Sequence, residues 1–131
     1  MDAARKRRLR TVLLIALALG AGGFLLVFVW RPGCPILGLT GLYCPGCGGQ
    51  RMLRSLVHGD AVGAFGYNPY LMIAGPLLAL YVLAEAVLYV RGRPALGRRR
   101  WVQLLLGALV LAAMLFMVLR NLPAFRWMAP D

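Results

Sequence analysis

The sequence is poor in reactive side chains. Its 131 residues include only three cysteines, one histidine and four acidic residues. No stretch interleaves basic and aromatic residues in the way that stacks nucleic-acid bases. No alternation of strand-like and helix-like segments surrounds the cysteines. These absences argue against a nucleic-acid-binding domain and against a thioredoxin-like domain, and no internal repeat is visible.

Apolar residues are in excess. Hydrophobic residues make up 61% of the chain and the mean hydropathy is +0.74, whereas soluble domains are roughly 45–50% apolar. Three long stretches, residues 11–30, 70–90 and 101–119, contain a single charged residue, Glu85. Each is long enough to cross a hydrocarbon core of about 30 Å. The sequence therefore predicts an all-α integral membrane protein with three transmembrane helices.

The net charge of +11 indicates how these helices are oriented. Five basic residues lie in residues 1–10 and five more in residues 91–100, immediately beside apolar stretches. Lys and Arg accumulate on the cytoplasmic side of membrane spans, so we expect both segments in the cytoplasm. Residues 31–69 and the tail, residues 120–131, then lie outside the cytoplasm, the tail along the membrane surface.

The loop of residues 31–69 is long enough to fold on itself. We expect two short interfacial helices in it. The first covers residues 50–58, where apolar and polar side chains alternate with helical spacing. Asp60 is placed to cap the second helix, and Asn68 followed by Pro69 has the pattern that opens the next span.

The cysteines of this loop can hold a metal ion. Two residues separate Cys44 from Cys47, the spacing with which two thiolates chelate one ion. Cys34 offers a third ligand. Because zinc prefers four ligands, His58, the only histidine, is the candidate for the fourth.

Two other uses of the cysteines remain open. Three cysteines allow at most one intramolecular disulfide and leave one thiol, so a disulfide can pin the loop in an oxidising compartment. Alternatively, Cys44 and Cys47 form a redox pair whose thiolate is stabilised by a helix start and by Arg51. Our interpretation is a scaffold or interaction module with a cysteine-pinned loop, and no enzymatic activity is predicted. The expected partners are the lipid bilayer and, for an interaction module, another membrane protein.

Glu85 is the one acidic residue inside a predicted span. It lies about 9 Å along the helix axis from Arg91, so we expect a structural ion pair at the membrane surface. A transport function would rest on Glu85 and on the helix-kinking Pro76 alone, and transport paths usually need more than one intramembrane polar group.

The middle of the chain also resembles a known family. Cys34-Pro35, Thr40-Gly41, the run Cys44-Pro45-Gly46-Cys47-Gly48, Arg51, Gly59-Asp60 and Asn68-Pro69 follow one another in an order that resembles the family catalogued as domain of unknown function 2752. Gln50 stands where threonine is common in that family. The resemblance implies a small multi-pass protein of the bacterial cytoplasmic membrane and implies no established activity.

Overall fold

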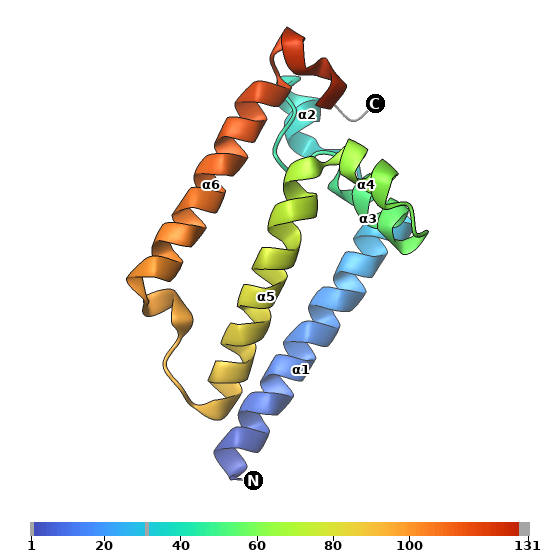
Figure 1. Cartoon of the computed structure of the whole chain (residues 1–131). Helices are drawn as coiled ribbons and strands as arrows, with labels where there is room; N and C mark the ends of the chain where they lie inside the picture. The colour runs from blue at the N-terminus through green and yellow to red at the C-terminus, as the bar shows by residue number, and fades with distance from the viewer. Residues whose placement is uncertain (1, 31, 129–131) are drawn as a thin grey trace.

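The computed structural model describes residues 2–30 and 32–128. Met1, Arg31 of the cysteine loop and residues 129–131 of the tail lie outside the described residues. Within them, every regular element is helical (Figure 1). The elements are, in order, α1 (Ala3–Phe24), η1 (Leu25–Trp30), α2 (Pro35–Thr40), α3 (Gly49–Val57), α4 (Ala61–Tyr67), α5 (Pro69–Arg91), η2 (Leu96–Arg98), α6 (Arg100–Arg120) and η3 (Pro123–Met128).

Three helical segments are long and apolar enough to cross a membrane: Ala3–Trp30 with 28 residues, Pro69–Arg91 with 23 and Arg100–Arg120 with 21. At 1.5 Å per residue even the shortest measures about 31 Å, the thickness of a hydrocarbon core. Their leucines are largely exposed on the isolated chain, as expected for side chains that face lipid. The predicted all-α fold with three membrane-spanning helices is confirmed, and the chain fits a multi-pass membrane protein.

The loop between the first two spans contains three short helices, whereas the sequence analysis expected two. The one that was missed, α2, begins at Pro35 and ends at Thr40. Its start is defined by a proline in the first turn, and it stops at Gly41, which has a φ of 69°. Proline suits a first helical turn and glycine tolerates positive φ. Residues 40–41 therefore form the end of this helix.

The spans are not packed along their whole length. In Figure 1, α5 runs between α1 and α6, and α6 diverges from α5 away from the short helices. α5 and α6 meet near the loop, where the Tyr70 hydroxyl donates to the Leu109 carbonyl at 3.0 Å and the Tyr70 ring stacks on Phe116. Most buried residues lie at this end, among them Met52, Ala64 and Ala74. The packed core therefore supports the cysteine loop.

Candidate thiol site

Backbone hydrogen bonds shape the cysteine turn. The Cys47 N–H donates to the Cys44 carbonyl at 3.1 Å, and the Gly49 N–H donates to the Gly46 carbonyl at 3.0 Å. In addition, the Cys44 N–H donates to the Cys47 sulfur at 3.3 Å. Gly48 has a φ of 83°, which only glycine adopts without strain. The turn therefore directs both thiols to one side and passes directly into α3.

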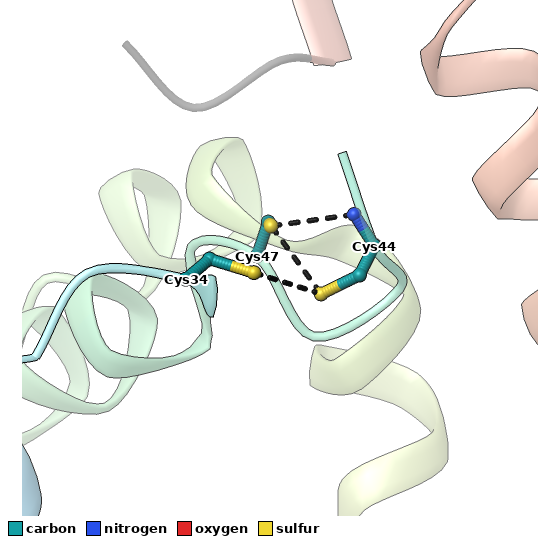
Figure 2. Close-up of side chains that lie close together, drawn as sticks. All are labelled: Cys34, Cys44 and Cys47. Carbon is teal, nitrogen blue, oxygen red and sulfur yellow. Dashed lines mark hydrogen bonds between the residues drawn. The ribbon is translucent and has the colours of Figure 1, made fainter. Parts of the chain in front are cut away.

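A third thiol joins this pair. Cys34 precedes α2, and its sulfur lies 3.4 Å from the sulfur of Cys44, which is itself 3.3 Å from the sulfur of Cys47 (Figure 2). All three sulfur atoms lie within 4.8 Å of one another, and all three are free thiols. Cys47 is buried, while Cys34 and Cys44 are half-buried. The fold thus gathers every cysteine of the chain into one cluster.

Cys34 and Cys47 do not ionise alike. Burial raises the pKa of Cys47 to about 12, assisted by hydrogen bonds from Cys47 to the other two thiols. Burial acts in the same direction on Cys34, but hydrogen bonds from the Leu37 backbone and from the neighbouring thiols outweigh it and lower the Cys34 pKa. Cys34 therefore loses its proton more readily than Cys47.

Asn68 holds the turn from the side of α5. Its side chain is fully buried, and its amide nitrogen donates to the carbonyls of Pro45 at 2.8 Å and Cys47 at 3.0 Å. Its side-chain oxygen accepts from the Leu71 N–H at 2.9 Å, which caps α5 at the turn where Pro69 takes a first position. One amide therefore joins the start of a membrane span to the cysteine turn.

Arg120, the last residue of α6, holds the same turn from the other side. Its guanidinium group is 1% exposed and donates to the carbonyls of Cys47 at 2.8 Å, Tyr67 at 3.3 Å and Cys44 at 3.4 Å. The group also lies over the Phe116 ring at 5.2 Å. Its Nε is buried and has no hydrogen-bond partner within the described residues. A full positive charge is thus buried beside the cysteine turn.

Asn121 extends this contact by one residue. Its side-chain oxygen accepts from the Tyr43 N–H at 2.9 Å, and its side-chain nitrogen donates to the Tyr43 carbonyl at 2.9 Å. The Asn121 side chain thus pairs with both backbone groups of Tyr43, as a neighbouring strand does in a β-sheet. Sequence reasoning missed both Arg120 and Asn121, because an arginine at the end of an apolar stretch is ordinarily an interfacial anchor.

An open groove of about 700 Å³ borders the thiols. Its walls include Cys34, Cys44 and Cys47 together with Gln50, Arg51 and Arg54 of α3. Arg51 is exposed in this groove, and it makes no hydrogen bond to a sulfur atom in the described part of the chain. Arg54 donates through Nε to the Gln50 carbonyl at 3.3 Å. Anionic molecules can therefore reach the thiols past two arginines.

His58 does not join the thiols. It follows the last residue of α3, and its Nδ1 lies 2.8 Å from the Arg54 carbonyl. Among the described residues, the group of side chains close enough to hold a metal ion consists of the three cysteines without His58. The reason is geometric: α3 has nine residues and separates the cysteine turn from His58 by about 13 Å.

The remaining residues singled out from the sequence have local contacts. Asp60 accepts from the Gly63 N–H at 2.8 Å and caps α4. Glu85 accepts from the Gly97 N–H at 2.7 Å, which ties α5 to the connection before α6. Among residues 2–30 and 32–128 Glu85 forms no ion pair, so the expected pairing with Arg91 is corrected to a backbone contact.

The molecule that emerges is a multi-pass, all-helical membrane protein whose loop gathers three thiols. Residues 34–82 match the family model described as Protein of unknown function (DUF2752). This match confirms the resemblance given by the cysteine motif and covers the cysteine loop and the first part of α5. No curated protein and no solved structure shows significant similarity to the chain.

Proposed function

We propose that the protein is a membrane scaffold whose cysteine loop is held together by a thiophilic metal ion, such as Zn²⁺, bound to Cys34, Cys44 and Cys47. The observation that carries this proposal is the convergence of all three thiols, from two separate segments, within 4.8 Å. Thiolates select soft or borderline ions. The ion would tie the segment before α2 to the turn before α3.

The spacing of the sulfur atoms favours a shared ion. Three thiolates bound to one zinc at about 2.3 Å in a tetrahedral arrangement lie about 3.8 Å from one another. The sulfur of Cys44 is 3.4 Å from that of Cys34 and 3.3 Å from that of Cys47. Small side-chain adjustments therefore produce the ligand geometry. The fourth position would open to the groove, where water or an exogenous ligand can enter.

The buried guanidinium of Arg120 also supports an anionic centre. Three thiolates around a divalent ion carry one net negative charge, and Arg120 donates to the backbone of two of the three ligands. A buried charge is costly unless an opposite charge compensates it. Within residues 2–30 and 32–128 no carboxylate pairs with Arg120. A metal-thiolate group would supply the missing compensation.

The proposed location is the extracytoplasmic face of a bacterial cytoplasmic membrane. The dense basic segments, residues 1–10 and 91–100, would remain in the cytoplasm. Because α1 and α5 both separate these segments from the cysteine loop, the loop and η3 would face outward. A membrane-impermeant thiol reagent should then label the metal-stripped loop in intact spheroplasts, and labelling only after lysis would reverse the orientation.

The test of the metal site is a zinc titration of the purified, reduced protein with thiols counted in parallel. We expect one zinc per chain, and the thiols should be protected from reagent until a chelator is added. Replacing Cys34, Cys44 or Cys47 with serine should each weaken binding, whereas His58→Ala is the matched control and should bind normally. Full thiol reactivity at saturating zinc, or equal weakening by His58→Ala, would reject the site.

Thiol redox exchange is a second candidate, because Cys34 and Cys44 border the open groove and their sulfur atoms are adjacent. The Cys34 thiolate would attack the disulfide of a partner protein and release one partner thiolate. Cys44 would then attack the mixed disulfide, forming a Cys34–Cys44 disulfide and leaving the partner as a dithiol. Cys44→Ser should trap the mixed disulfide on Cys34 in cells. A metal scaffold gives no such adduct.

A further inference from the structure

The opposite end of the molecule holds a second charged pocket, formed where α1 begins and α5 ends. It has a volume of about 520 Å³. Its wall contains four arginines and one acidic residue: Arg5, Arg8, Arg91, Arg93 and Asp2. Four guanidinium groups against one carboxylate leave three positive charges in the pocket. Orientation in the membrane accounts for basic residues at this end, but it does not account for the convergence of four arginines on one pocket.

Arg8 is held in place between the two helices. Its Nη1 donates to the Tyr89 carbonyl at 3.4 Å, and its guanidinium lies 5.7 Å from the centre of the Tyr89 ring. Gly92 has a φ of 70°, and a Cβ there would lie 2.6 Å from the Arg8 Nη1. The glycine therefore both ends α5 and leaves room for the arginine. These contacts fix one wall of the pocket.

The other arginines have unused donors. Among residues 2–30 and 32–128, no ion pair forms with Arg5, Arg91 or Arg93, and the last two are exposed. A guanidinium presents five N–H donors in a fork that matches the oxygen atoms of a phosphate. The pocket therefore offers several phosphate-binding groups directed at one volume.

The depth of the pocket identifies the kind of anion. The uncharged stretch of α1 starts at Thr11, about 4.5 Å along the axis from Arg8. On α5 the last uncharged residue is Val90, and Arg91 follows it directly as the final residue of the helix. The arginines thus lie where two membrane spans reach the headgroup layer. Basic pockets between spans on the cytoplasmic side bind anionic lipid headgroups, and the orientation proposed above puts this end of the molecule there.

We propose that this pocket binds the phosphate group of an anionic phospholipid. Three net positive charges favour a headgroup with two phosphodiesters over one with a single phosphodiester. The acyl chains would extend along the exposed apolar surface of the spans beside the pocket. The site would hold α1 and α5 together at the end away from the cysteine loop.

The experiment is native mass spectrometry of the full chain in detergent with cardiolipin, phosphatidylglycerol or phosphatidylcholine added. We expect cardiolipin to bind most tightly and phosphatidylcholine least. Arg91→Gln with Arg93→Gln should weaken cardiolipin binding about thirtyfold. The matched control, Arg98→Gln with Arg99→Gln, removes the same charge from exposed positions outside the pocket and should change binding less than about threefold.

A separate arm adds inorganic phosphate, which has the same charged oxygen atoms without acyl chains. Failure of millimolar phosphate to displace cardiolipin supports the lipid as the ligand. Displacement at equal affinity would reject the lipid and assign the pocket to free phosphate. Equal binding of phosphatidylcholine and cardiolipin, or equal weakening by both double variants, would overturn the pocket as an anion site. None of these outcomes depends on the cysteines, so the lipid site and the metal site stand or fall separately.

Discussion

Arginine has opposite surroundings at the two ends of this helical bundle. At the loop end, Arg120 is 1% exposed and directs its donors to the carbonyls of Cys44, Cys47 and Tyr67. At the basic end, Arg91 and Arg93 are exposed and border an open pocket. Arg120 therefore donates hydrogen bonds within the chain, whereas Arg91 and Arg93 can donate hydrogen bonds to a separate molecule.

This comparison shows that the role of an arginine in this protein depends on whether its guanidinium group is buried or exposed. A buried guanidinium that donates to several carbonyls fixes the backbone, and its removal takes a charged donor from each of them. An exposed guanidinium contributes little to stability and remains free to bind a charged ligand. Substitutions at the two ends should therefore separate stability from binding.

The largest expected effect is that of Arg120→Met. The side chain keeps similar bulk, but three loop carbonyls each lose a charged donor, and we expect a loss of about 3–5 kcal/mol in unfolding free energy. Thermal unfolding in detergent and protease resistance of the cysteine loop measure it. Arg99→Met, at an exposed position, is the control and should stay within about 0.5 kcal/mol. Equal stability of the two variants would remove the distinction between the two ends.

Asn68→Ala should have the next largest effect. It removes two donors to the cysteine turn and the cap of α5, and we expect about 2–4 kcal/mol of destabilisation. Asn68→Asp separates the two roles, since it keeps an oxygen for the Leu71 N–H and loses the donors to Pro45 and Cys47. If the donors matter, Asn68→Asp should also lose loop protection against protease. Full protection in Asn68→Asp would assign the effect to the cap alone.

A pH effect should follow from Cys47 in the reduced, metal-free protein. Burial raises its pKa from 9.0 to about 12 in the folded chain, so the folded state holds this proton more tightly than the unfolded state. The resulting stability is fully present below pH 9 and is lost as the pH rises toward 12. Thermal unfolding across this range should show the decline, and Cys47→Ala should show a smaller one. If wild type and Cys47→Ala lose stability in parallel as the pH rises, Cys47 is not the source of the pH dependence.

The smallest stability effect is expected for Arg91→Gln with Arg93→Gln. Both side chains are exposed, so lipid-free protein in detergent should unfold within about 0.5 kcal/mol of wild type. The same variant should lose the stabilisation that added cardiolipin gives to wild type. Strong destabilisation without lipid would mean that these arginines, like Arg120, hold the fold.

Local sequence patterns predict much of the fold. Uninterrupted apolar stretches indicated three spanning helices, and the structure confirms them. The family resemblance carried by residues around the cysteine motif is confirmed by the match over residues 34–82. The helix α2 was missed because its six residues are too few for helical periodicity to appear, and Gly38 interrupts them.

The candidate site depended on contacts that no local pattern reveals. Arg120 and Cys47 are 73 positions apart in the sequence, and only the packing of α6 against α5 and the loop brings them together. His58 was proposed as a ligand by elimination, and the length of α3 places it away from the thiols. Pairing Glu85 with the nearest arginine overlooked the backbone N–H of Gly97, which the η2 connection brings to it.

X-ray absorption spectroscopy at the zinc edge tests the central claim most directly, because it counts the atoms around the ion. Zinc-loaded wild-type protein should show three sulfur neighbours at about 2.3 Å and one lighter neighbour, oxygen or nitrogen. His58→Ala should give the same spectrum, since His58 lies outside the thiol cluster. A first shell with two sulfur atoms or fewer, or a histidine contribution lost in His58→Ala, would contradict the account.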